Sequence, residues 1–172
     1  MKMDGRSSPE AGSPRPLIRQ ANESDVDAIF RVHGDSIRAL CRERYGEREI
    51  EAWIAFRPPE AYRSSFASRE LFVAEWQKRI VGFGQLDPRR GEIEACYVAP
   101  EAIGSGVGSA LLDRMERQAR RHGHAIVRLN ATLNAEPFYA RMGYRRLGPA
   151  RHRVSKDVNL ECVRMEKALD GA

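Results

Sequence analysis

The sequence contains few cysteines and none of the patterns in which cysteine usually binds metal or forms disulfide frameworks. Its three cysteines, Cys41, Cys96 and Cys162, are widely spaced in 172 residues, form no Cys-x-x-Cys pair and lie near no paired histidines. A structural zinc site needs closely spaced ligands. The sequence therefore predicts no metal site and three reduced thiols, as expected of a cytoplasmic protein.

The sequence also lacks an apolar run long enough to cross a membrane, because charged residues interrupt its hydrophobic stretches. The net charge of +5 comes from arginines scattered among acidic residues, with no helix-turn-helix pattern and no RNP-type aromatic motif. The hypothesis that this protein binds nucleic acid would rest on net charge alone, and such binding would weaken steeply with salt. We therefore expect neither a membrane nor a nucleic acid as a partner.

Composition along the chain indicates one domain after a short leader. Residues 1–16 are rich in Ser, Gly and Pro and carry no apolar core, so we expect a disordered leader. Residues 17–168 have the length of a single domain with a sizeable core.

Changes of hydrophobic period within this domain predict the element order β-α-α-β-β-β-α-β-α-β-β. Ser24 is a candidate cap for the first helix, and Pro58-Pro59 is expected to end the second. The expected strands and later helices are the strands 17–20, 71–76, 80–86, 92–98, 125–129, 144–147 and 158–165, and the helices 47–56, 107–122 and 134–142.

The stretch Y-V-A-P-E-A-I-G-S-G-V-G-S, from Tyr97 to Ser109, combines a strand end, a glycine-rich loop and the start of an amphipathic helix. Gly104, Gly106 and Gly108 allow the backbone to approach a ligand closely, and a helix N-terminus attracts phosphate. The loop lacks the Lys-Ser/Thr pair of a Walker A motif, and it follows an antiparallel meander, unlike a dinucleotide-binding loop. Alone it is a weak signal, because many such loops are only tight turns.

A second cluster, N-A-E-P-F-Y-A-R-M-G-Y, runs from Asn134 to Tyr144. Taken singly, Asn134 is as well explained as a helix cap, and Tyr139 as a core residue. The two clusters together, in this order and at this separation, are far more informative than either alone.

With V-A-P at Val98–Pro100, I-G-S-G-V-G at Ile103–Gly108 and the cluster at Asn134–Tyr144, the chain resembles the GNAT superfamily of N-acetyltransferases from about Leu17 to Met165. The resemblance implies an α/β (α+β) fold with a central mixed, mostly antiparallel sheet, splayed fourth and fifth strands and flanking helices. It also implies an acyltransferase that uses acetyl-CoA as co-substrate. The family's loop usually begins with Gln or Arg where this chain has Ile103, so we expect a modest loss of cofactor affinity.

The resemblance also implies roles for individual residues. Val98 N–H would polarise the thioester carbonyl, and Tyr139 would donate a proton to the departing thiolate. The cofactor would further contact a set of residues on the strand end, loop and second cluster: Tyr97, Ala99, Ile103, Gly104, Ser105, Gly106, Val107, Gly108, Ser109, Asn134 and Phe138.

Glu92 and Glu94 lie two residues apart on a predicted strand, which puts them on one face with Cys96 and Val98. By resemblance, Glu92 matches the catalytic glutamate of histone-type members. Either carboxylate could attract a cationic amine and act as base, or be an ordinary solvated charge. Cys96 is better explained as a buried thiol than as an acyl carrier, because no His-Asp pair supports it.

The sequence thus predicts an N-acetyltransferase in which a primary amine attacks acetyl-CoA directly in a ternary complex. A non-catalytic acyl-CoA-binding sensor is the alternative. The acceptor, a small-molecule or peptide amine, is undetermined, with a slight preference for a small cationic amine. The last strands could pair across a homodimer or complete a monomer's sheet.

Overall fold

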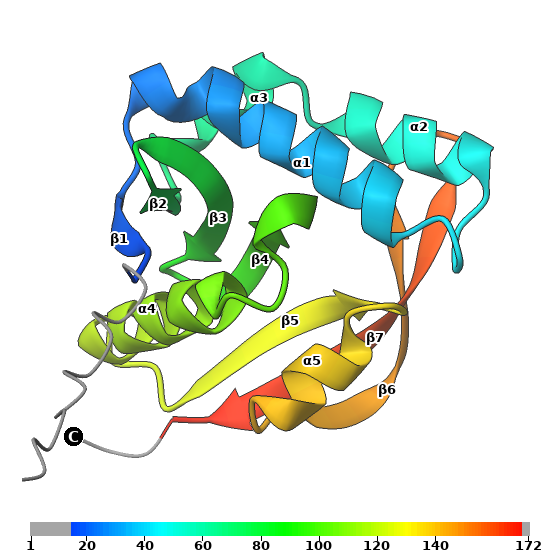
Figure 1. Cartoon of the computed structure of the whole chain (residues 1–172). Helices are drawn as coiled ribbons and strands as arrows, with labels where there is room; N and C mark the ends of the chain where they lie inside the picture. The colour runs from blue at the N-terminus through cyan, green and yellow to red at the C-terminus, as the bar shows by residue number, and fades with distance from the viewer. Residues whose placement is uncertain (1–14, 170–172) are drawn as a thin grey trace, which may run out of the picture.

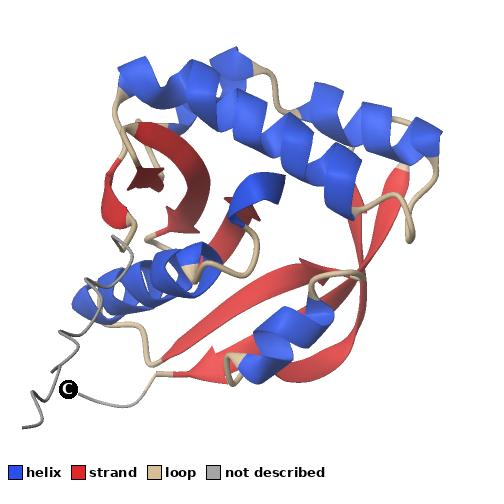
Figure 2. Ribbon diagram, in the orientation of Figure 1, coloured by secondary structure: helices blue, strands red, loops and turns tan. Residues whose placement is uncertain are grey.

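The computed structural model describes residues 15–169, which form a seven-stranded sheet with helices on both faces (Figures 1 and 2). The strands are β1 (Leu17–Gln20), β2 (Glu70–Trp76), β3 (Arg79–Asp87), β4 (Glu92–Val98), β5 (Ile126–Thr132), β6 (Arg145–Arg153) and β7 (Asn159–Ala168). The helices are α1 (Val26–Leu40), α2 (Glu47–Phe56), α3 (Pro59–Ser65), α4 (Val107–Arg121) and α5 (Glu136–Arg141), with 3-10 turns η1 (Glu23–Asp25) and η2 (Pro100–Ala102). The expected leader lies almost wholly outside the described residues.

The strand order is β1-β2-β3-β4-β5-β7-β6, and only the β4–β5 pair is parallel. This confirms the predicted mixed, mostly antiparallel sheet. β4 and β5 pair at two positions only, Glu92 with Arg128 and Ile93 with Leu129, and their carboxyl ends then diverge. The predicted splay therefore lies at the centre of the sheet, where it opens a gap.

Helix α3 is an element that the sequence analysis missed. Pro58-Pro59 was expected to end the second helix, and α2 does end at Phe56, but Pro59 also occupies the first turn of α3. Proline is tolerated there because the first N–H groups of a helix have no intrahelical partner.

The prediction of Ser24 as a helix cap was wrong, and the alternative that Asn134 only caps a helix is excluded. The Asn22 side chain accepts a hydrogen bond of 2.9 Å from the Ser24 N–H, and η1 precedes α1, so Ser24 is not the cap. The N-cap of α5 is Ala135, without a side-chain cap bond, so Asn134 does not cap that helix. The side chain of Asn134 is thus available for another role.

Helices α1 and α4 cover opposite faces of β3 and β4. A Cβ atom on Gly82 would lie 2.7 Å from Val107 of α4, whereas the Phe83 ring meets His33 of α1 edge-on at 6.4 Å. Successive residues of a strand point to opposite faces, so odd-numbered positions of β3 face α1.

None of the helices within residues 15–169 is long and apolar enough to cross a membrane.

Candidate active site

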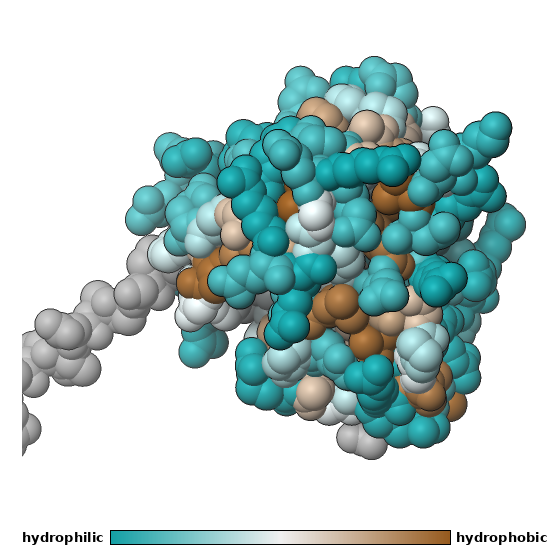
Figure 3. All heavy atoms as spheres, turned by 90° about the vertical axis from the view of Figure 1, so that its right-hand side faces the viewer, coloured by the Kyte–Doolittle hydropathy of each residue, from teal (hydrophilic) through white to brown (hydrophobic). Residues whose placement is uncertain are grey.

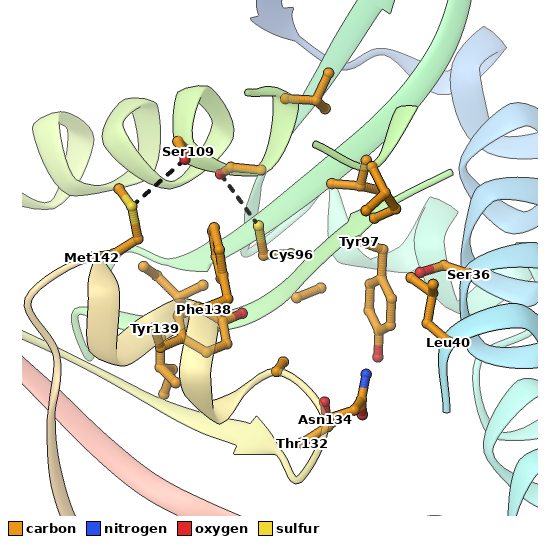
Figure 4. Close-up of a pocket in the computed structure, with 18 of the residues that line it drawn as sticks. Ser36, Leu40, Cys96, Tyr97, Ser109, Thr132, Asn134, Phe138, Tyr139 and Met142 are labelled. Atoms are coloured by element: carbon orange, nitrogen blue, oxygen red, sulfur yellow. Dashed lines mark hydrogen bonds between the residues drawn. The ribbon is translucent and has the colours of Figure 1, made fainter. Parts of the chain in front are cut away.

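The gap between β4 and β5 opens a cavity of about 650 Å³ (Figure 4). The glycine loop with the start of α4 forms one wall, and α5 with the turn before it forms another, while the ends of α1 and α2 close the far side. The cavity is lined by most of the residues predicted for the site: Glu94, Tyr97, Val98, Ile103, Gly104, Gly106, Val107, Gly108, Ser109, Asn134, Phe138 and Tyr139. Three others, Glu92, Ala99 and Ser105, are not among its lining residues.

The glycine loop leaves backbone donors open at the start of α4. Gly104 and Gly106 adopt positive φ values of 80° and 84°, which side-chain-bearing residues rarely adopt. The first intrahelical bond of α4 runs from Ala110 N–H to Gly106 O, at 3.0 Å. The N–H groups of residues 107–109 therefore lack intrahelical acceptors and form the positive end of the helix dipole.

Not every N–H group of the loop is available. Ile103 N–H and Ser105 N–H donate to the carbonyls of Pro100 and Ala102, each at 3.3 Å. The Ile103 residue is 54% exposed, so its apolar side chain gains little from burial at the cavity rim. Within the described part of the chain, Gly104 N–H and Gly106 N–H have no backbone acceptor, so they add to the three open donors at the helix start.

The β4 backbone directs one donor into the gap. Ala99 N–H donates to Val81 O of β3, at 2.8 Å. Because successive N–H groups of a strand point to opposite edges, Val98 N–H points away from β3 and towards the gap. A carbonyl oxygen in the gap could accept a hydrogen bond from this N–H group.

Tyr139 approaches the same cavity from α5. It is 7% exposed, and its ring packs edge-on against Phe138 at 5.1 Å and Tyr144 at 5.7 Å. Burial, with a smaller effect of Cys96, raises the pKa of Tyr139 well above its ordinary value of 10.0. The phenol is therefore protonated throughout the neutral range and can donate a proton.

Asn134 lies on the turn between β5 and α5, and its side chain points towards the Tyr97 hydroxyl (Figure 4). Its Oδ1 atom is buried and has no hydrogen-bond partner within the described protein. An unsatisfied buried acceptor is costly, and a bound molecule that donates a hydrogen bond would satisfy it.

Cys96 faces α4, with its Sγ 3.9 Å from Gly108 O (Figure 4). Burial raises the pKa of this thiol to about 12, so it is a poor nucleophile at neutral pH. Cys96 is half-buried and lines the cavity, so it is less buried than expected, but its raised pKa agrees with a thiol that carries no acyl group. Among residues 15–169, no cluster of three or more His, Cys, Asp or Glu side chains is arranged to hold a metal ion.

A β-bulge changes the expected arrangement of the acidic pair. Gln85 pairs with Ala95 but Leu86 with Ile93, so Glu94 is an extra residue in β4. Glu94 Oε2 accepts hydrogen bonds from Gln85, on the α1 face, at 2.6 Å and from Arg69 at 2.8 Å. The prediction that Glu94 shares a face with Cys96 was therefore wrong.

Glu92 lies outside the cavity and is held by two arginines. Its Oε1 is 2.6 Å from Arg164 Nη1, and its Oε2 is 2.9 Å from Arg90 Nη2. Both carboxylate oxygens are thus engaged, whereas the interactions of Glu94 involve Oε2 alone.

Sequence analysis missed the residues that hold Glu94. Gln85 is 1% exposed and links two groups: its Oε1 accepts from Arg57 Nη2 at 3.1 Å, and its Nε2 donates to Glu94. A glutamine within the apolar strand I-V-G-F-G-Q-L was the only available signal, and it did not identify a partner.

The split sheet, with an open helix N-terminus at the mouth of its gap, is the arrangement that the resemblance to acyltransferases predicted. The chain belongs to the GNAT acetyltransferase family, because the family model described as "Acetyltransferase (GNAT) domain" matches residues 41–169.

Individual relatives agree with this family. An uncharacterized N-acetyltransferase of Archaeoglobus fulgidus is 28% identical over 144 residues, which are 75% of this chain and 92% of the relative. A GCN5-related N-acetyltransferase from Rhodopseudomonas palustris has a TM-score of 0.85 at 26% identity, covering 93% of this chain and 99% of that one. The PaiA N-acetyltransferase of Thermoplasma acidophilum, solved with coenzyme A, has a TM-score of 0.75 at 21% identity, covering 90% and 99%.

Proposed function

We propose that this protein transfers an acetyl group from acetyl-CoA to a primary amine, which attacks the thioester directly in a ternary complex. The observation that carries the proposal is the gap between β4 and β5, with Val98 N–H directed into it and Tyr139 on the opposite wall. The amine nitrogen would bond to the acetyl carbon, and the bond from that carbon to sulfur would then break.

The cofactor would enter along the splayed strands. Its pyrophosphate would accept hydrogen bonds from the N–H groups of Val107, Gly108 and Ser109, and its pantetheine arm would run past Phe138 to Val98. Asn134 Oδ1 would accept from an amide of that arm. The similarity in fold to a protein solved with coenzyme A supports this assignment.

Val98 N–H and Tyr139 would then act at the two charged atoms of the transition state. The N–H would stabilise negative charge on the thioester oxygen. The Tyr139 hydroxyl would give its proton to the thiolate as coenzyme A leaves.

The attacking amine must lose a proton, and we assign its acceptance, directly or through water, to Glu94. This carboxylate lines the cavity and is oriented through Oε2, while Oε1 is left for the acceptor. Glu92, engaged by Arg164 and Arg90, would support the sheet instead.

A thermal-shift titration with acetyl-CoA, coenzyme A and ATP, followed by thiol-release assays with primary amines, tests the proposal. A ligand that binds only the folded state raises stability with its concentration. We expect saturable shifts with acetyl-CoA and coenzyme A but not ATP, and amine-dependent thiol release. Binding without release for any amine would favour the non-catalytic acyl-CoA sensor, and no binding would overturn both.

A further inference from the structure

Arg57 lies immediately after α2, one helical turn beyond Trp53, which lines the active-site cavity. Arg57 is not among the residues that line the cavity, but its guanidinium reaches Gln85 of β3. Gln85 in turn donates to Glu94, which does line the cavity, so a single side chain separates Arg57 from the site.

The partners of the Arg57 guanidinium are uncharged. Nη2 donates to Ser65 Oγ at 3.0 Å and to Gln85 Oε1 at 3.1 Å, and Cζ lies 5.0 Å from the centre of the Tyr62 ring. Nε is buried without an acceptor, and no carboxylate of residues 15–169 lies within ion-pair distance. A partly buried guanidinium without a counter-charge is costly and attracts an anion.

The neighbouring charges are already balanced. Arg69 pairs with Asp87 and Glu94, and Arg90 and Arg164 both pair with Glu92. These three arginines offset the three carboxylates, so Arg57 leaves the group with one surplus positive charge. This end of the site therefore does not favour a polycationic acceptor, even though two glutamates lie on β4.

Strand β6 also lies close to Arg57. His152 of β6 meets the Phe56 ring edge-on at 5.5 Å. Burial and then Arg57 lower the pKa of His152, while Glu94 opposes them, so the imidazole lies within range of both charges. Figure 3, which views the α2 and β6–β7 end, shows a largely hydrophilic face with apolar residues in separate patches.

We propose that Arg57 binds a carboxylate of the acceptor, so that the acceptor is an amine that also carries a carboxylate group. The acceptor's amine would lie at Glu94 Oε1 and its carboxylate at the Arg57 guanidinium, separated by the side chain of Gln85. A planar guanidinium matches a carboxylate with two parallel hydrogen bonds. The inference rests on the proposed acetyl transfer, because it names the acceptor of that reaction.

The experiment uses product analogues that need no turnover. Thermal shifts are measured on the full chain saturated with coenzyme A, using N-acetylglycine and N-acetyl-L-phenylalanine, each against its carboxamide. We expect the acids, and not the amides, to raise Tm at millimolar concentration. Arg57→Gln should weaken acid binding about 10-fold or more, and Arg57→Lys should retain part of it. Arg63→Gln, on an exposed arginine of α3, should behave like the unmodified protein.

The shift produced by coenzyme A alone separates the two proposals and shows that each variant is folded. If the coenzyme A shift is normal, three results overturn the carboxylate site only. These are equal responses to acid and amide, no response to either acid, and acid binding that stays intact in Arg57→Gln. Absence of the coenzyme A shift in the unmodified protein overturns the proposed function itself.

Discussion

Gln85 Nε2 donates a hydrogen bond of 2.6 Å to Glu94 Oε2 across the bulge between β3 and β4. The bond orients a carboxylate that lines the cavity and leaves its other oxygen for a ligand. Glu92, two residues earlier on the same strand, is held by Arg164 and Arg90 outside the cavity.

The two glutamates should therefore respond differently to removal of their charge. We expect Glu94→Gln to lower kcat/KM for the amine about 100-fold, because the carboxylate that accepts the amine proton is lost. Glu92→Gln, the matched control, should leave kcat/KM nearly unchanged. Steady-state kinetics with the amine provides the measurement, and a large loss in Glu92→Gln with little loss in Glu94→Gln would reverse the assignment.

Tyr139→Phe should lower kcat about 100-fold or more while leaving acetyl-CoA affinity unchanged, because only the proton for the leaving thiolate is lost. Since burial raises the pKa of Tyr139, this group should contribute no limb to the pH–rate profile at neutral pH. Burst and steady-state kinetics, with the coenzyme A thermal shift as a binding control, provide the measurement. An unchanged kcat would remove Tyr139 as the acid.

Gly108→Val should block the cofactor without unfolding the domain. A Cβ at Gly108 would lie 3.3 Å from Phe138 Cζ and 3.5 Å from Val98 Cγ2, and both residues line the cavity. We expect coenzyme A affinity to fall about 10-fold or more, by calorimetry. Gly34→Ala, in α1 and facing the flexible end of Arg38, should bind normally and be more stable by about 0.5–1 kcal/mol.

His33 should make stability depend on pH. It is 1% exposed, its Nδ1 has no partner, and burial followed by Arg57 lowers its pKa from 6.5 to about 3. As the pH falls, the unfolded chain binds the proton before the folded chain does. The stability that comes from keeping His33 neutral is therefore complete above pH 6.5. It is lost as the pH falls towards 3, so the free energy of unfolding decreases by up to about 1.4 kcal/mol per pH unit.

The free energy of unfolding, measured by urea unfolding at each pH across this range, should depend less steeply on pH for His33→Phe than for the unmodified protein. Asp25, whose pKa is lowered chiefly by its hydrogen bonds with Arg19, loses its contribution at still lower pH in both proteins. Equal slopes between pH 6.5 and 4 would contradict the role of His33.

Lys167→Met should destabilise the fold by about 3 kcal/mol, because it leaves a buried charge unpaired. Lys167 Nζ lies 2.8 Å and 3.0 Å from the two carboxylate oxygens of Glu116, which is 4% exposed and also accepts from Tyr144. The double variant Glu116→Leu/Lys167→Met should recover most of that loss. Denaturant unfolding of the complete cycle checks this, and additive losses would contradict the coupling.

Much of the cavity could be predicted from the sequence because its walls are local structures. The glycine loop with the start of α4 lies within Tyr97–Ser109, and Tyr139 lies within one short cluster, so neighbouring residues decide their conformation. The limits of α2 and β4 match the predicted 47–56 and 92–98 for the same reason. The mixed sheet and the splay of its fourth and fifth strands followed from the family resemblance and are confirmed.

The tertiary structure alone decided the polar side of the site. The bulge at Glu94 depends on how β3 pairs with β4, and that pairing turns the carboxylate away from Cys96 towards Gln85. Charge balance depends on partners remote in sequence, such as Arg164, which lies 72 positions from Glu92. The sequence thus determined the glycine loop and the helix that follows it, since these depend on local backbone conformation and hydrophobic period, and its motifs indicated the family and, through it, the gap. Which carboxylate keeps an oxygen open to the cavity and whether Arg57 meets an acidic partner depended on side chains that meet only when the chain is folded.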